Sequence, residues 1–290
     1  GVLLQVSHLA VGPGGGINAD AKGYANDRGP GRGSLTGAWG GGAGFGGRGG
    51  DGSTALGGVT YGSVSDPISA GSGGNDWQST SPGGFGGVGG GIVRVMAVNS
   101  VTVDGTLSAN GGFCSHASGG ASGGSIFLTC ATFGGSGGGL FARGSEGDPE
   151  SRTSFGGGGG GGRISVNYGA LAAQHSLQFS ALCPTSTVYA TPGSWRGAWL
   201  GTLWFPDTNL LSTTLSVFDG LLTVPGFTAW APPSLTVSNA TIGLPPGLQL
   251  NVGGDVLVSG TGGALILGSN STLTCGGNLT VTNNGQLRVY

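Results

Sequence analysis

The chain has 290 residues, of which 70 are Gly, and only 8% of its residues are charged, with a formal net charge of -2. A typical domain has about 25% charged residues, so this chain lacks both the basic surface that binds nucleic acid and the high net charge that favours disorder. No apolar run approaches the roughly 20 residues of a membrane-spanning helix, and the strict Gly-X-Y period of collagen is missing.

The first half of the chain repeats a Gly-Gly-x-Ile start that is followed by alternating apolar residues. These starts lie at Ile92, Ile126 and Ile164, and Val2 takes the same place in the opening stretch "GVLLQV". Each start predicts a strand with one apolar face, followed by a connector and a shorter second strand. The stretch "DPISAGSGG", from Asp66, is predicted to be another second strand.

The last part of the chain repeats at a tighter period. The stretch "LNVGGDVLVS", from Leu250, matches "LTCGGNLTVT", which begins 23 residues later at Leu273. The match places Val256 beside Leu279 in the next repeat. Strands this short cannot bury an apolar face alone, whereas stacked repeats form a continuous apolar ladder.

Helical patterns are nearly absent, so the sequence predicts an all-β chain. We expect a parallel β-solenoid, a right-handed β-helix, with long glycine-rich loops packed in rows of polyglycine-II type. A β-sandwich also fits short strands with frequent turns and is the alternative. One continuous solenoid is expected, with a glycine-rich part over 1–180, an aromatic-rich continuation over 181–233 and regular short coils over 234–290.

Two stretches carry a family resemblance: "GGASGGSIFLTCATF", from Gly119, and "FGGGGGGGRISVNY", from Phe155. They resemble a recurrent pattern of very large secreted proteins of bacteria and some protists, in which "GGGSGGSI" and "GGGGGGRI" strands alternate with "ISANGG"-like strands. The resemblance implies a glycine-rich β-helix of a cell-surface or extracellular-matrix protein. The last 60 or so residues resemble the β-helical coils of adhesin and autotransporter passengers. The resemblance implies no catalytic residue.

Motifs for chemistry are weak. No GKS or GKT follows a glycine run, so a phosphate-binding loop is not predicted. The stretch "GGRGGDGST" places Asp51 where a calcium-binding nonapeptide has its aspartate, but a single unrepeated copy, like Asp76 in "GGNDW", favours a surface turn. Glu146, Asp148 and Glu150 lie together in one charged loop. We therefore predict no metal ion, no cofactor and no catalytic residue.

Four cysteines occur, and none forms a CxxC pair. Cys114 and Cys183 follow second strands in predicted turns, so they are the better disulfide candidates. Cys130 and Cys275 are expected to face inward as small apolar side chains.

Three N-x-Ser/Thr sequons make Asn239, Asn270 and Asn278 candidates for N-glycosylation if the chain is secreted by a eukaryote. Asn278 aligns with Asp255 at a predicted turn, so we expect it to be exposed.

These observations predict an extracellular or cell-surface structural or adhesive protein, not an enzyme. We expect a subunit of a fibre, sheath or surface layer that assembles head-to-tail, because uncapped strand edges invite pairing. Glycans are the other expected partner; nucleic acid and a membrane span are not expected. The alternatives are a polysaccharide-active enzyme on the β-helix fold and a carbohydrate-binding surface protein, for which the tryptophans between Trp195 and Trp230 would form the platform. An ice-binding protein needs Thr-x-Thr rows, which do not recur through the chain.

Overall fold

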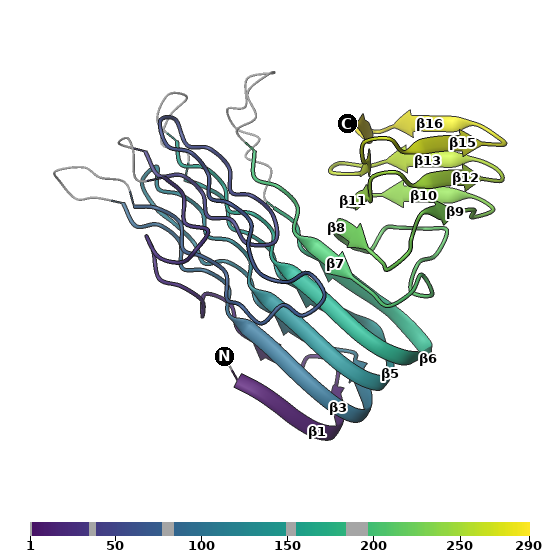
Figure 1. Ribbon diagram of the computed structural model, residues 1–290, viewed down its shortest axis with the longest axis horizontal. Helices are drawn as coiled ribbons and strands as arrows, with labels where there is room; N and C mark the ends of the chain where they lie inside the picture. The colour runs from purple at the N-terminus through teal and green to yellow at the C-terminus, as the bar shows by residue number, and fades with distance from the viewer. Residues whose placement is uncertain (1, 35–38, 77–83, 149–154, 184–196) are drawn as a thin grey trace. The chain divides into compact units, whose positions relative to one another are not determined.

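The protein is built from strands and extended glycine-rich segments (Figure 1). The structure, a computed structural model, describes residues 2–34, 39–76, 84–148, 155–183 and 197–290, and it contains no helix in these ranges. In the part of the chain so described, no helix is therefore long and apolar enough to cross a membrane. The chain divides into two compact units, Gly1–Thr202 and Leu203–Tyr290.

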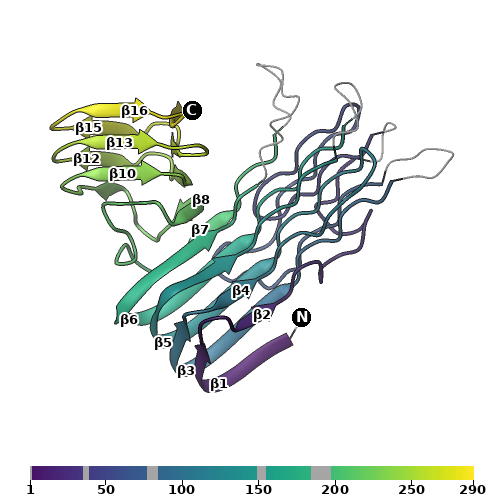
Figure 2. The same ribbon diagram turned by 180° about the vertical axis from the view of Figure 1, so that it is seen from behind.

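The strands of the first unit are long and pair in parallel in the order β1-β3-β5-β6. They curve back on themselves, and two short strands, β2 and β4, run beside the returning half of β5 (Figures 1 and 2). The bounds are β1 (Val2–Val11), β2 (Gly16–Asn18), β3 (Ile92–Val103), β4 (Thr106–Ser108), β5 (Ser125–Phe141) and β6 (Arg163–Ser180). A further strand, β7 (Thr202–Trp204), spans the boundary between the units in the sequence.

Apolar rows that cross the strands form the core of the first unit. Val93, Ile126 and Ile164 are register partners, and all three are buried. On the returning half, Leu107, Leu140 and Phe179 form another buried row. Because burial of one such side chain contributes about 1.5–3 kcal/mol, these rows hold the strands in register.

The predicted alignment of the Ile starts is confirmed for Ile126 and Ile164 but is wrong by one residue for Ile92. Ile92 pairs with Ser125, and Val93 takes the inward place. A one-residue slip turns every side chain of a strand to the other face. The observed register therefore turns Arg94 away from the core. Its guanidinium lies over the Phe127 ring, 5.7 Å from the centroid.

The glycine-rich segments form a bundle held together by backbone hydrogen bonds. In the run 156–162, Gly156, Gly159 and Gly162 donate to the carbonyls of Asp148, Ser145 and Ala142, whereas Gly157 and Gly160 donate to Gly40 and Ala43. Every third residue thus serves the same neighbouring segment, as expected for an extended chain with three residues per turn. We call the segments 40–50, 71–75, 86–91, 118–124 and 156–162 the glycine bundle.

Close approach of the backbones explains why the bundle uses glycine. A Cβ atom on Gly159 would overlap the Ala121 carbonyl, and one on Gly157 would overlap the Gly50 carbonyl. At some positions of the bundle, a serine hydroxyl accepts the hydrogen bond that a backbone carbonyl would otherwise accept. Ser72 N–H, for example, donates to Ser122 Oγ at 2.8 Å. The bundle therefore satisfies its buried backbone groups without regular strands.

The second unit contains three parallel sheets of short strands, with the orders β8-β11-β14-β17, β10-β13-β16 and β9-β12-β15. Its strands are β8 (Phe218–Thr223), β9 (Ala229–Trp230), β10 (Leu235–Ser238), β11 (Thr241–Leu244), β12 (Gln249–Val252), β13 (Val256–Ser259), β14 (Ala264–Leu267), β15 (Thr272–Cys275), β16 (Leu279–Thr282) and β17 (Gln286–Val289). Leu250 pairs with Leu273 and Val256 with Leu279, which confirms the predicted offset. We call β15, β16 and β17 the outer layer, because each pairs on one side only among the described strands.

The predicted β-solenoid is wrong, although the all-β character is confirmed. The strands lie in parallel sheets, and no sheet of the described residues closes on itself. The long strands β1, β3, β5 and β6 of the first unit have 10 to 18 residues. Their register shifts at irregularities within the strands, as between Val6 and His8. In a solenoid of short coils, the strands would instead end in turns. No strand forms at the stretch from Asp66. The β-sandwich is wrong as well, because every described ladder is parallel.

Candidate functional site

Four aspartates at strand ends bind the backbone of the adjoining strand or turn. In each, one carboxylate oxygen, Oδ1, accepts a hydrogen bond from a backbone N–H, at 2.6 to 2.9 Å. The pairs are Asp20–Asn110, Asp104–Ser136, Asp219–Thr241 and Asp255–Asn278. These carboxylates, which we call the aspartate caps, are thus used to align neighbouring backbones. Sequence reasoning placed Asp255 at a predicted turn; the recurrence of Asp or Asn beside Gly was the signal that could have identified the caps.

Asp27 and Asp76 form a carboxylate pair within the first unit. Asp76 N–H donates to Asp27 Oδ1 at 3.0 Å, and both carboxylate oxygens of Asp76 accept from the Asn26 amide at 2.8 and 2.9 Å. Burial raises the pKa of Asp27 from its ordinary value of 3.8, and the Asp76 charge adds to the shift. The pair therefore binds protein donors.

The calcium interpretation of Asp51 gains no support. Its carboxylate forms an ion pair with Arg48 at 3.0 Å and accepts from the Gly57 N–H at 2.7 Å. Within the described residues, no three His, Cys, Asp or Glu side chains lie close enough to hold a metal ion. In the loop of Glu146, Asp148 and Glu150, the last residue lies outside the described residues.

His8 lies in an exposed polar cluster on β1 and β3. Its Nδ1 is 2.8 Å from Ser100 Oγ, and the Asn99 amide nitrogen is 3.1 Å from its Nε2. With Asn99 donating to Nε2, Nδ1 has the proton and donates to Ser100. The imidazole then cannot accept the Ser100 proton, so the cluster is not an activated serine.

Arg163 is a buried cation at the end of the long glycine run. Its guanidinium donates to the Tyr61 carbonyl at 2.7 and 3.1 Å, to the Phe45 carbonyl at 3.3 Å and to Thr202 Oγ1 at 3.2 Å. It also lies 5.3 Å from the centroid of the Phe45 ring. Burial lowers the pKa of Arg163. This side chain fastens the glycine bundle to β6, a role that sequence reasoning missed because Arg163 follows seven glycines.

The structure agrees with only some of the predictions for the four cysteines. Cys114 Sγ donates to the Glu146 carbonyl at 3.1 Å, and burial raises the pKa of its thiol to about 12. Cys183 is also buried, and its Sγ donates to the Ala198 carbonyl at 3.0 Å. Disulfide formation by Cys114 or Cys183 stays a prediction. Cys130 faces inward as expected, whereas Cys275, in the outer layer, is only half-buried.

The three sequon asparagines all lie on the surface of the second unit. Asn239, Asn270 and Asn278 are exposed, and the first two adopt positive φ angles of 53° and 58°. Their exposure is what a glycosylation site requires, and glycosylation itself stays a prediction.

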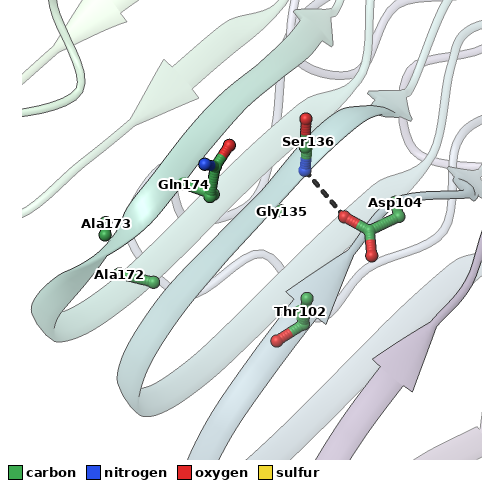
Figure 3. A pocket seen from close by; sticks show the side chains of 7 residues that line it. All are labelled: Thr102, Asp104, Gly135, Ser136, Ala172, Ala173 and Gln174. Atoms are coloured by element: carbon green, nitrogen blue, oxygen red, sulfur yellow. Dashed lines mark hydrogen bonds between the residues drawn. The ribbon is translucent and has the colours of Figure 1, made fainter.

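The hollows of the described surface are open and shallow. The larger has a volume of about 460 Å³ and lies over the bend of β3, β5 and β6, where Thr102, Asp104 and Gln174 surround small residues (Figure 3). Asp104 is an aspartate cap here, since one of its oxygens accepts from Ser136. A second groove, of about 300 Å³, lies at the β1 edge beside Val2, Leu4 and Ile17. Neither groove contains paired carboxylates.

The open strand edges are the most distinctive surfaces of the molecule. In the outer layer, the inward-facing Leu279 and Val281 are each 45% exposed, whereas their partners Val256 and Val258 are fully buried. In the first unit, β1 pairs only with β3 among the described strands, and Val2 is 70% exposed. β1, β15 and β16 contain no Lys, Arg, Asp, Glu or Pro. Natural edge strands usually have such residues as protection against pairing, so these edges are open to association.

Comparison with protein-family models, with curated proteins and with solved structures finds no match for this chain.

Proposed function

We propose that this chain is an extracellular structural or adhesive protein, a subunit that assembles head-to-tail through its open strand edges into a fibre, sheath or surface layer. The observation that carries the proposal is the exposure of apolar ladder residues at both edges. Val2 on β1, and Leu279 and Val281 on β16, expose side chains whose register partners are buried. An additional strand at either edge would bury them and satisfy the edge backbone.

The glycine bundle supports a structural function. Its segments are bonded to each other through backbone groups, which do not depend on pH or salt as ion pairs do. Among the described residues there is one Lys/Arg–carboxylate ion pair, Arg48–Asp51. The family resemblance of the glycine-rich stretches and the exposed sequons are consistent with an extracellular location, because N-linked glycans are found on secreted proteins.

A polysaccharide-active enzyme is less well supported. Glycoside hydrolysis ordinarily uses two carboxyl groups that flank the scissile bond. Here four aspartates act as caps, and Asp27 and Asp76 bind protein donors. For the carbohydrate-binding alternative, Trp195 lies outside the described residues and Trp199 is exposed, whereas the groove at Asp104 contains no aromatic side chain.

The proposal is tested by imaging and sedimenting the purified full-length chain over a range of concentrations. We expect filaments or sheets whose amount grows with concentration. A variant with Leu4→Lys on β1 and Val281→Lys on β16 places a charge in each open edge and should remain monomeric. Lys on the outward side of the same strands, at Gln5 and Thr280, is the matched control and should weaken assembly less. A wild-type chain that stays monomeric at millimolar concentration would contradict the proposal.

A further inference from the structure

We propose that the outer layer of the second unit binds a strand–Gly-Gly–strand segment with the unit's own repeat pattern. The pattern is apolar-x-apolar-Gly-Gly-x-apolar-x-apolar, where the residue after Gly-Gly is any residue except Pro, as in residues 250–258. The inference goes beyond the proposed function, because β1 (VLLQVSHLAV) lacks this pattern and the segment therefore belongs to another partner.

The apolar rows define the spacing of the incoming side chains. Leu235, Val256 and Leu279 form one row across β10, β13 and β16, and only the last is exposed. Val237, Val258 and Val281 repeat this arrangement two residues further along. A segment that continues both rows must have two apolar residues separated by one residue.

The turn before β16 shows which backbone groups the partner must supply. Asn278 N–H donates to Asp255 Oδ1 at 2.7 Å, and Val256 N–H donates to the Asn278 carbonyl at 2.8 Å. In the outer layer Asn278 takes the place of Asp255, and its side-chain oxygen accepts no hydrogen bond from the described residues. In a parallel ladder a residue directs its N–H and carbonyl to the same neighbour, so Leu279, in the place of Val256, directs both to the open side. The partner must therefore offer a backbone N–H and a backbone carbonyl at this level, which any residue except Pro supplies.

The Gly-Gly pair in the pattern follows from close packing of the turns. Gly276 N–H donates to the Val252 carbonyl at 2.9 Å, and Gly277 N–H donates to Gly254 at 3.0 Å. A Cβ on Gly276 would overlap the Gly253 carbonyl, and one on Gly277 would overlap the Asp255 side chain. Residues that stack on Gly276 and Gly277 in the same way must also be glycine.

A second copy of the outer layer fits this surface less well. Two identical edges that continue one sheet through a twofold axis run antiparallel, so the Asn278 side chain would not meet a backbone N–H in the observed way. The parallel segment satisfies the exposed rows and the Asn278 oxygen together.

The test uses the full-length chain and a fluorescent synthetic peptide of residues 248–261. We expect saturable binding measured by fluorescence anisotropy, and slower hydrogen exchange at the amides of Leu279 and Val281. A peptide with Val256→Asn and Val258→Asn, and another with Gly253→Ala and Gly254→Ala, should bind at least about tenfold more weakly, because the first loses two apolar contacts and the second overlaps the turn.

Variants of the protein separate the outer layer from other surfaces. Val281→Asn should weaken peptide binding by about tenfold, because it removes an apolar contact from the exposed row. Thr280→Asn puts the same side chain on the outward face of β16 and should change binding by less than about threefold. Asn278→Ala should weaken binding, and Asn278→Asp, which keeps the acceptor, should restore it. Unchanged hydrogen exchange at β12 and β13 will show that the variants are folded.

Equal binding to the Val281→Asn and Thr280→Asn variants, or no peptide binding, would overturn the inference. Dimers that form through the outer layer and exclude the peptide would also overturn it, by assigning the surface to a second copy. Filaments without peptide binding would leave the proposed function standing and remove only this inference. Peptide binding by a chain that never assembles would support this inference and contradict the proposed function.

Discussion

The carboxylate of Asp255 accepts a hydrogen bond from the backbone N–H of Asn278, 23 residues further along the chain, at 2.7 Å. Asp104 holds Ser136 in the same way, also at 2.7 Å, in the other unit. The two units differ in strand length, yet both use a carboxylate at a strand end to set the position of the next backbone. Hydrogen bonds to a charged acceptor are stronger than those between neutral groups, so the aspartate caps contribute to register as well as to stability.

Replacing Asp255 tests this role. Asp255→Ala should lower the free energy of unfolding of the second unit by about 1 kcal/mol, a value at the low end for charged acceptors because the side chain is exposed. Asp255→Asn keeps the accepting oxygen and should cost less. Hydrogen exchange at the Asn278 amide gives the local readout: it should accelerate in the Ala variant and change little in the Asn variant. Equal exchange in both variants would show that the cap has no role.

Packing of the glycine bundle predicts a large difference between two Gly-to-Ala substitutions. Gly159→Ala would place a methyl group against the Ala121 carbonyl, and overpacking of this kind costs about 1–3 kcal/mol. At Gly12 nothing lies within 4 Å of an added Cβ, so Gly12→Ala should be neutral or stabilise slightly through the unfolded chain. Urea unfolding of the two variants makes the comparison, and similar midpoints would contradict the packing of the bundle.

Short repeats with distinct side chains were predictable from the sequence. The pairing of Leu250 with Leu273 was set by matching apolar and Gly-Gly positions, and the structure has the same register. Ile92 was placed wrongly because the glycines before it have no side chains to fix the register. Arg94 explains why the observed register of β3 differs from the expected one. The expected register would have placed the Arg94 charge in the core, which is costly without a partner.

The path of the glycine bundle could not be derived from the sequence. Seven identical residues, Gly156 to Gly162, have no pattern that names their neighbours, and their partners come from at least three separate segments. The fit of Arg163 depends on carbonyl groups of Phe45 and Tyr61, more than 100 residues earlier. Such contacts are made by the backbone, and backbone groups are the same in every residue apart from proline.

Arg163 is predicted to be essential for the first unit. Arg163→Met would leave the Tyr61 carbonyl without the donors it has in Arg163, whereas the Phe45 carbonyl would keep the Tyr61 N–H. The expected loss of stability is about 2–4 kcal/mol. Arg163→Lys should rescue it only in part, because one ammonium lacks the fork that reaches several acceptors. Arg94→Met is the matched control, since the buried Nε of Arg94 has no hydrogen-bond partner among the described residues, and it should change stability little. Thermal unfolding of the three variants provides the measurement.

The carboxyl group of Asp27 gives the first unit a pH dependence of unusual sign for an aspartate. Burial raises its pKa above 3.8. The hydrogen bond from the Asp76 N–H and the charge of Arg32 oppose this rise, whereas the charge and side chain of Asp76 add to it. The folded protein therefore keeps a proton on Asp27 at pH values where the unfolded chain has released it. The contribution of Asp27 to stability is greatest below pH 3.8 and falls as the pH rises through the raised pKa.

Asp27→Asn isolates this effect, because the amide oxygen can still accept from the Asp76 N–H. The melting temperature of the variant, relative to the wild type, should rise as the pH increases from about 3.8 to 7 and stay level below that window. Arg32→Gln removes a charge that opposes the rise in the pKa of Asp27. With Asp27 unchanged, this variant should therefore lose more stability than the wild type as the pH rises. Parallel melting curves for wild type and Asp27→Asn across the whole range would show that the pKa of Asp27 is not raised in the folded protein.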